Sequence, residues 1–264
     1  MSTKSSKALI TGGSGYLASN LINDKKFRSL FSEIRSLGRN PKPERIKDQI
    51  NIDFQKINLI EANLELKIIR ETDLVIHTAH LRNIDADKEL LNNFKNKRVI
   101  FFSSAAVYGN SPEGKVLTVN DECDPISDYG LYKLELEDYI KENFEDYLIL
   151  RISNPYGGEN PGRNIYEIFK TSIAKDLPIN INAKGPEEII RDFIKMEDFI
   201  KQVIKLVKED ATGTFNISSG IGSSLESMLE DLAKEQGKTL KDLEINYKGF
   251  KEGDIQHSIL KPGS

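Results

Sequence analysis

The sequence predicts an α/β protein built on a doubly wound parallel sheet, and three observations lead to this fold class. Short apolar runs alternate with stretches of helical periodicity from residue 7 to residue 151. The runs are apolar at nearly every position, as expected for strands that are covered on both faces of a sheet. A glycine cluster follows the first run and leads into a helical stretch, as in the first strand-to-helix turn of such folds.

The alternation defines an ordered series of elements. Strands are expected at residues 7–11, 33–37, 73–77, 98–103 and 147–151. Helices are expected at residues 16–24, 87–95 and 131–143. Beyond residue 154 prolines and glycines become frequent around a helix at 166–175, a strand at 214–218 and a helix at 225–236. We therefore predict a main domain formed by residues 1–154 and about 191–218, and a smaller, discontinuous C-terminal lobe formed by residues 155–190 and 219–264.

The composition of the 264 residues argues against several classes of function. Lys and Arg number 37 against 41 Asp and Glu, a net charge of −4, which predicts no binding of nucleic acid. No apolar run approaches the roughly 18 residues of a membrane helix, and the run after the N-terminal residues is too short for a signal peptide. The single cysteine, Cys123, and three scattered histidines predict no disulfide and no metal site. These features predict a cytoplasmic protein that binds no membrane, and His77 is expected to be a packed or hydrogen-bonded residue.

The glycine cluster, Thr11–Ala18, has the sequence TGGSGYLA between a strand and a helix. Gly12 would allow a tight turn, and Gly15 would let the backbone approach a pyrophosphate at the amide-rich start of the helix. A plain tight turn is the alternative, but the order of strand, loop and helix favours dinucleotide binding. The main domain is therefore expected to bind the cofactor, and the smaller lobe the substrate. The candidate contacts in the loop are Gly12, Ser14, Gly15, Tyr16 and Leu17.

The second strand ends without the carboxylate that would bind the ribose hydroxyls of NAD. Gly38 leaves room for a 2′-phosphate and Arg39 could pair with it, so NADP(H) is favoured and NAD(H) is possible. The alternative is that Arg39 is a solvated turn residue. Asn58 and Leu59, which follow a third strand expected between those at 33–37 and 73–77, are candidates for contact with the adenine.

Acid–base chemistry is expected where the strand at residues 98–103 ends and where the next helix begins. Tyr129 and Lys133 are four residues apart and share a helix face, and an ammonium beside the phenol would lower its pKa. Ser104, at the carboxyl edge of the sheet, could bind the same substrate oxygen. The same Tyr-x-x-x-Lys spacing at Tyr166/Lys170 and Tyr247/Lys251 does not follow such a strand, so these pairs are expected to be solvated residues.

Taken together, these segments resemble an extended short-chain dehydrogenase/reductase of the NAD-dependent epimerase/dehydratase family, whose members act on nucleotide sugars. The likeness spans residues 7–220 and rests on the order of its motifs more than on any one of them. The segments that carry it are Thr11–Ala18, Val75–Ala79, Phe102–Gly109, Tyr129–Lys133, Arg151–Gly157, Arg191–Ile194 and, more weakly, Asn216–Gly220.

The resemblance implies a Rossmann-type domain, a nicotinamide that transfers hydride, and a catalytic triad of Ser104, Tyr129 and Lys133. It also implies that Thr78, Ala79 and Lys133 belong to the cofactor site. Asn154 and Arg191, with Ser104, would bind the substrate, and the first two would contact its diphosphate.

The residues next to the triad narrow the expected reaction. Ala105 and Ala106 stand where the family's 4,6-dehydratases have Asp and Glu, so dehydration of the sugar is not expected. The family's fucose-forming epimerase-reductases use a cysteine near the catalytic serine, but Cys123 lies elsewhere in the sequence and is interpreted as a bystander. The favoured activity is NADPH-dependent reduction of a 4-keto sugar, because of Arg39. An NAD-retaining 4-epimerase is the alternative, because the Ala-Ala-Val-Tyr-Gly segment is similar to that of the epimerases. A non-catalytic dinucleotide sensor is a third hypothesis, motivated by the small substrate lobe.

Two departures from the family bear on the partners. The segment 78–97 is shorter than in relatives, where it helps to form a dimer, so a homodimer is possible but in doubt. The substrate lobe is small, so the identity of the sugar cannot be carried over. Asp192 and Asp198 are expected to be surface or helix-capping residues.

Overall fold

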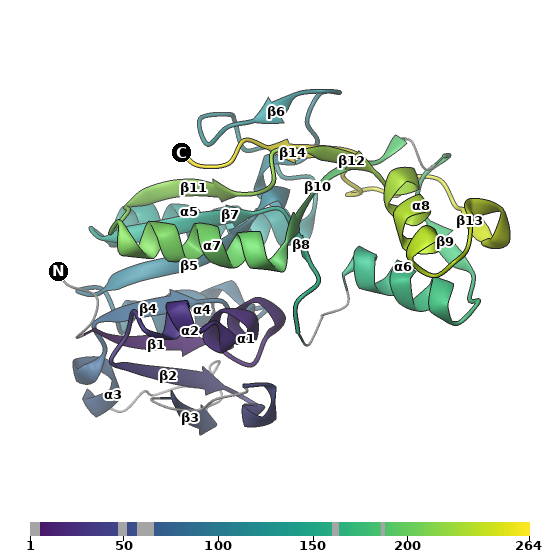
Figure 1. Cartoon of the computed structure of the whole chain (residues 1–264). Helices are drawn as coiled ribbons and strands as arrows, with labels where there is room; N and C mark the ends of the chain where they lie inside the picture. The colour runs from purple at the N-terminus through teal and green to yellow at the C-terminus, as the bar shows by residue number, and fades with distance from the viewer. Residues whose placement is uncertain (1–5, 47–51, 57–65, 160–163, 186–187) are drawn as a thin grey trace. The chain divides into compact units, whose positions relative to one another are not determined.

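A seven-stranded sheet forms the centre of the first of two compact units. Its strands follow the order β11-β7-β5-β4-β1-β2-β3 (Figure 1). The registers of β1 with β2 and β4, of β2 with β3, and of β4 with β5 are parallel. The strands are β1 (Lys7–Thr11), β2 (Glu33–Gly38), β3 (Ile52–Lys56), β4 (Leu74–His77), β5 (Arg98–Ser104), β7 (Tyr147–Ile152) and β11 (Gly213–Ile217). The predicted Rossmann-type parallel sheet is confirmed.

The computed structural model describes residues 6–46, 52–56, 66–159, 164–185 and 188–264. The first unit comprises residues 1–103, 132–151 and 200–215, and the second comprises residues 104–131, 152–199 and 216–264. The predicted assignment of cofactor binding to one domain and substrate binding to the other stays a prediction.

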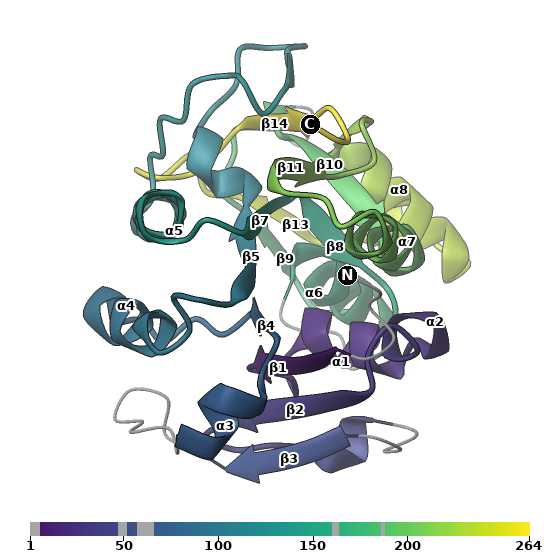
Figure 2. The same ribbon diagram turned by 90° about the vertical axis from the view of Figure 1, so that its left-hand side faces the viewer.

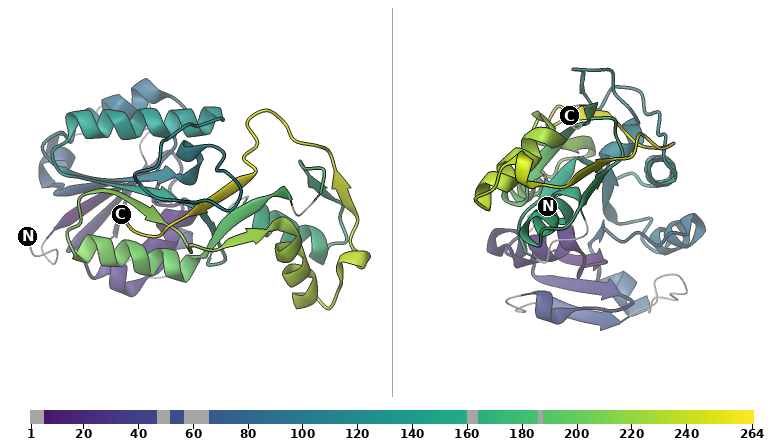
Figure 3. Two further views of the ribbon diagram at one scale, coloured as in Figure 1. Left: turned by 90° about the horizontal axis from the view of Figure 1, so that it is seen from above. Right: turned by 90° about the vertical axis from the view of Figure 1, so that its right-hand side faces the viewer.

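Helices cover both faces of the first sheet, as the doubly wound prediction requires. Figure 2 shows α4 and α5 on one face and α1, α2 and α7 on the other, and Figure 3 shows α5 (teal) and α7 (green) on opposite sides. The helices along this part of the chain are α1 (Tyr16–Asn23), α2 (Lys25–Arg28), α3 (Leu66–Glu71), α4 (Ile84–Asn92), α5 (Asp128–Asn143) and α7 (Met196–Lys208).

Two of these helices begin three residues earlier than the sequence predicts, because polar side chains cap them. Asn83 accepts a hydrogen bond of 3.0 Å from the Ala86 amide at the start of α4. Ser127 accepts one of 3.1 Å from the Gly130 amide at the start of α5. The second cap places Tyr129 within the first turn of its helix.

The second unit contains a small sheet in the order β12-β10-β14-β6, in which β8 also pairs with β10, and a parallel pair of β13 and β9. Its strands are β6 (Val116–Leu117), β8 (Asn154–Tyr156), β9 (Ile179–Ile181), β10 (Ile190–Lys195), β12 (Gly222–Ser224), β13 (Ile245–Tyr247) and β14 (His257–Leu260). The helices α6 (Ile165–Ala174) and α8 (Leu225–Glu235) pack with β9 around Phe169, Leu229 and Leu232 (Figure 1).

In the described part of the chain, none of the helices combines the length and apolar character needed to cross a bilayer.

Candidate functional site

The glycine loop forms a tight turn between β1 and α1. Gly12 has φ +71°, and a Cβ there would lie 3.1 Å from Ala79 Cα and 3.2 Å from Ala79 N. The Gly15 amide donates to the Gly12 carbonyl at 2.7 Å, and Gly15 is the N-cap of α1. A side chain at position 12 would therefore be both strained and crowded. The amides that begin α1 suit an anionic group, as predicted for a pyrophosphate.

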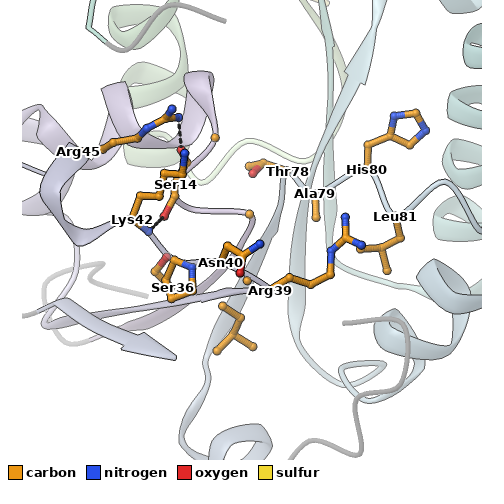
Figure 4. Close-up of a pocket in the computed structure, with 15 residues that line it drawn as sticks. Ser14, Ser36, Arg39, Asn40, Lys42, Arg45, Thr78, Ala79, His80 and Leu81 are labelled. Atoms are coloured by element: carbon orange, nitrogen blue, oxygen red, sulfur yellow. Dashed lines mark hydrogen bonds between the residues drawn. The ribbon is translucent and has the colours of Figure 1, made fainter. Parts of the chain in front are cut away.

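A cavity of about 380 Å³ opens at this loop. It lies at the carboxyl ends of β1, β2 and β4, where strand order reverses between β1 and β4, and such a point is where open α/β sheets bind ligands. Figure 4 shows the residues that line it from the loop, from the end of β2 and from the segment after β4. They are Gly12, Ser14, Gly15, Ser36, Leu37, Gly38, Arg39, Asn40, Pro41, Lys42, Arg45, Thr78, Ala79, His80 and Leu81.

The charges around this cavity are positive. Arg39, Lys42 and Arg45 line it, and its lining as described contains no carboxylate. Arg39 is exposed and extends toward Leu81 (Figure 4). The Lys42 amide donates to Ser14 Oγ at 2.7 Å and the Arg45 guanidinium donates to the Ser14 carbonyl at 3.0 Å, which ties this segment to the glycine loop. Lys42 and Arg45 were not predicted from the sequence, although they follow Arg39 by three and six residues and so form a cluster of positive charge after the second strand.

Most of the predicted cofactor residues lie at this cavity. Gly12, Ser14, Gly15, Arg39, Thr78 and Ala79 line it, whereas Tyr16 and Leu17 form the first positions of α1. Asn58 and Leu59, predicted to contact the adenine, lie outside the described residues.

Tyr129 and Ser104 belong to the second unit and are joined by a hydrogen bond. Ser104 is the last residue of β5, and its Oγ also accepts from the Ala106 amide at 3.2 Å. Although 43% of the Tyr129 surface is exposed, burial of its hydroxyl raises the pKa, and the bond to Ser104 opposes this only in part. The predicted lowering of the Tyr129 pKa is therefore wrong for the protein alone, because desolvation outweighs the favourable contacts of the phenolate.

Lys133 belongs to the first unit and is only 3% exposed. Its Nζ donates to the Phe102 carbonyl at 2.8 Å and lies 4.7 Å from the centre of the Phe101 ring. Burial lowers the Lys133 pKa to about 8, against the opposing charges of Asp87 and Glu137. Tyr129 and Lys133 are four residues apart on α5, so helix periodicity puts them on one side of that helix.

The depressed pKa of Lys133 predicts a pH-dependent stability. The unfolded chain holds this proton up to about pH 10.5 and the folded chain only up to about pH 8, so folding is disfavoured by protonation and the free energy of unfolding rises between these pH values. Lys133→Met should remove this pH dependence. At pH 7.5 its free energy of unfolding should exceed that of the wild type by about 3 kcal/mol, less the contribution of the lost hydrogen bond to the Phe102 carbonyl. Urea unfolding of both proteins at pH 7.5 and pH 9.5 measures it.

Lys234→Met, at an exposed position, is the control for this comparison. An equal pH dependence in the wild type and in Lys133→Met would contradict the assignment.

Asn154 and Arg191 lie on neighbouring strands of the second unit, β8 and β10. Asn154 Nδ2 donates to the Asp192 carbonyl at 3.0 Å. The Arg191 guanidinium donates to the carbonyls of Ile190, Ile255 and Gln256, and burial lowers its pKa to about 10 while Asp254 opposes the shift. The predicted contact of both residues with a diphosphate stays a prediction.

Asp192 is a buried hydrogen-bond acceptor, so its prediction as a surface or capping residue is wrong. Its side chain is 0% exposed and accepts bonds of 2.8 to 3.1 Å from Ser153 Oγ, from the amide and hydroxyl of Ser219, and from the Gly220 amide. The alternation of Arg191, Asp192 and Phe193 in a strand turns the central residue inward, and these donors satisfy its charge.

The comparisons with known proteins agree with one another. A family model described as "NAD dependent epimerase/dehydratase family" matches residues 8–218. The chain is 29% identical over 266 residues to the dTDP-4-dehydro-6-deoxyglucose reductase of Escherichia coli, with 88% of this chain and 82% of that protein covered.

Two solved structures extend this likeness. The UDP-glucose 4-epimerase of Thermus thermophilus, solved with NAD, has a TM-score of 0.82 at 23% identity and shares the fold over 97% of this chain and 90% of its own. A UDP-N-acetylglucosamine 4-epimerase from Methanobrevibacter ruminantium, solved with UDP-N-acetylmuramic acid, has a TM-score of 0.79 at 26% identity, covering 98% and 90%.

Proposed function

The chain belongs to the NAD-dependent epimerase/dehydratase family, and from this premise we propose that it oxidises or reduces a nucleotide-linked sugar with a bound nicotinamide dinucleotide. The resemblance drawn from the sequence motifs is thereby confirmed, as is the expectation that the chain is an enzyme. The carbonyl chemistry expected of Ser104, Tyr129 and Lys133, together with the glycine loop, supports the assignment of substrate class and cofactor.

The specific activity that we propose is the NADPH-dependent reduction of a 4-keto sugar. The observation that carries this choice is the charge of the cavity, which is lined by Arg39, Lys42 and Arg45 without a carboxylate among its described residues. A 2′-phosphate is favoured by such a lining, and the acidic residue that would bind a free ribose hydroxyl is not among the residues that line it. The relative from Escherichia coli that is named a 4-keto-sugar reductase supports the same choice.

The residues present fit such a cofactor. Gly12 allows a tight turn that a side chain there would strain and crowd, and the amides at the start of α1 would bind the pyrophosphate. Bound NADPH would supply the hydride for the carbonyl carbon. Tyr129, whose raised pKa keeps the phenol protonated at neutral pH, would donate a proton to the carbonyl oxygen, so that ketone, hydride and proton give the alcohol. Ser104 would orient the phenol through their hydrogen bond, and Lys133 would favour the phenolate left after transfer.

Removal of the Arg39 side chain tests the cofactor preference. Arg39→Ala should weaken NADPH binding about tenfold or more and leave NADH binding unchanged, because a charge-assisted bond to the phosphate is lost. Gly38→Asp should go further and reverse the preference, since a Cβ at position 38 meets nothing within 4 Å and the new carboxylate would repel the phosphate. Fluorescence titration with both dinucleotides measures the two affinities.

Arg70→Ala, an exposed arginine on α3, is the matched control for this pair of variants. An unchanged ratio of NADPH to NADH affinity in Arg39→Ala would remove the argument for the 2′-phosphate.

A 4-epimerase that retains its NAD is the second candidate, favoured by the two solved epimerases of the same fold. The two activities differ in their use of cofactor. A reductase consumes one NADPH for each nucleotide-linked 4-keto sugar, whereas an epimerase interconverts two sugar nucleotides with no added cofactor and no net oxidation. Mass spectrometry of what copurifies with the protein, followed by an assay for NADPH consumption, separates them. Interconversion without NADPH loss would reject the reductase.

A further inference from the structure

Asp87 on α4 is a buried carboxylate that the proposed chemistry does not use. It is 0% exposed, and its Oδ1 lies 2.9 Å from Nε2 of His77, which is also 0% exposed. Among the residues that the structure describes, neither oxygen of Asp87 has a well-aligned hydrogen-bond donor. The burial of a carboxylate in such surroundings lowers the free energy of unfolding, so Asp87 is a candidate for a functional role.

His77 connects this carboxylate to the first residue of the glycine loop. Its Nδ1 lies 2.9 Å from Oγ1 of Thr11, and the same Oγ1 accepts a bond of 3.3 Å from the Ala79 amide. Thr11 is 0% exposed, so its single hydroxyl proton needs an acceptor within the protein. If that proton points to Nδ1, the ring carries its own proton on Nε2, which faces Asp87. The opposite tautomer would place the Nε2 lone pair against a carboxylate oxygen.

We propose that Asp87 is a positioning residue that fixes the ring proton of His77 on Nε2 and thereby orients the Thr11 hydroxyl at the base of the dinucleotide site. In this arrangement the Ala79 amide donates to Thr11, the Thr11 hydroxyl donates to Nδ1 of His77, and the Nε2 proton of His77 faces the Asp87 carboxylate, whose Oδ1 lies 2.9 Å from Nε2. The effect on binding rests on the proposed function, whereas the position of the proton does not.

The Thr11 hydroxyl matters because this residue joins two segments that line the cavity. Thr11 is followed directly by Gly12, and its carbonyl accepts a bond of 2.6 Å from Thr78 Oγ1. Its hydroxyl accepts from Ala79 on the same segment. Since Gly12 also packs closely on Ala79, a turned Thr11 hydroxyl would move both walls of the cavity together.

Asp87 also acts on the charged groups around it. Burial lowers the pKa of both Lys133 and His80, and the negative charge of Asp87 opposes this shift at each of them. Two substitutions separate this charge from the fixing of the proton. Asp87→Asn removes the charge but keeps an oxygen that can accept from Nε2, and Asp87→Leu removes both.

Nitrogen NMR of the protein without bound dinucleotide tests the position of the proton directly. The chain has three histidines, so His80→Gln and His257→Gln assign the remaining ring to His77. We expect a protonated Nε2 and an unprotonated Nδ1 in the wild type and in Asp87→Asn, and a changed or mixed tautomer in Asp87→Leu. A proton on Nδ1 of the wild type would overturn the proposal, whatever the protein binds.

NADPH titration of the same proteins tests the consequence. Asp87→Asn should bind within about twofold of wild type and Asp87→Leu about tenfold more weakly or worse, with Asp85→Leu, at an exposed position of α4, as the control. Thermal unfolding separates positioning from a structural role, because replacing a buried carboxylate by an apolar side chain need not lower stability. A destabilised Asp87→Leu protein with unchanged NADPH affinity would overturn the positioning role. A wild type that binds no dinucleotide would reject the proposed function and leave the tautomer result standing.

Discussion

Tyr129→Phe should lower kcat for ketone reduction about 100-fold or more and leave the affinity for NADPH unchanged, because only the proton donor is removed. The phenol carries the proton at neutral pH, since burial raises its pKa. The ring remains, so the contacts of its faces are kept. Steady-state kinetics with a nucleotide-linked 4-keto sugar, together with NADPH titration, measures the two quantities separately.

Tyr247→Phe is the matched control for this substitution. Tyr247 has the same spacing to a lysine, Lys251, but it lies on β13 rather than on a helix after the fifth strand, and 40% of it is exposed. Its kcat should equal that of the wild type. If Tyr129→Phe and Tyr247→Phe were equally active, Tyr129 would not be the acid.

Arg151→Met should lower the free energy of unfolding by about 3–5 kcal/mol, the range found when one partner of a buried ion pair is removed. The Arg151 Nε lies 3.1 Å from both carboxylate oxygens of Glu137, and its Nη2 lies 2.8 Å from Oε2. Both residues are nearly inaccessible, at 4% and 0% exposure. Without the guanidinium, Glu137 still accepts hydrogen bonds from Ser103 Oγ at 2.5 Å and from Nζ of the partly exposed Lys141 at 3.4 Å. These two donors cannot replace a bidentate partner.

The double variant Arg151→Met/Glu137→Met separates the cost of an orphaned charge from the contribution of the pair itself. It should be more stable than Arg151→Met alone, because the carboxylate of Glu137, which loses its bidentate partner in the single variant, is removed as well. Urea unfolding of the wild type, both single variants and the double variant gives the coupling free energy. Additive losses in the double variant would contradict this account.

The sequence was sufficient for the middle of the central sheet because β1, β4, β5 and β7 are apolar over most of their length, whereas β3, with the sequence IDFQK, is not, and its bounds were not predicted. Runs such as Ala8–Ile10 and Leu148–Leu150 are buried on both sides, so local hydrophobicity and strand identity agree. The same reasoning missed β10 and α7, although Phe199, Val203 and Val207 follow the helical period and are buried. The mixed polarity of Arg191–Lys195 concealed that strand, because its inward positions include a carboxylate that only distant donors can satisfy.

The parts of the candidate site that depend on backbone conformation were predictable from the sequence. The properties that depend on the side chains packed around a residue were less predictable. The glycine loop follows from conformational freedom and the order of elements, and the cavity lies there. The direction of the Tyr129 pKa shift depends on how much protein surrounds the hydroxyl, which no spacing in the chain reveals. The contact of His77 with Asp87 likewise joins residues ten positions apart in the sequence, and its contact with Thr11 joins residues sixty-six positions apart. Only the folded chain brings these residues together.

The place of β14 in the second unit has a consequence for biosynthesis. This strand, His257–Leu260, lies between β10 and β6, which occur more than sixty residues before it. A ribosome therefore releases β6 and β10 long before the strand that separates them has been translated. The nascent second unit must leave two strand edges uncovered during that interval, and edges of this kind attract other chains. Chaperones that bind the second unit during translation should therefore bind at these two edges.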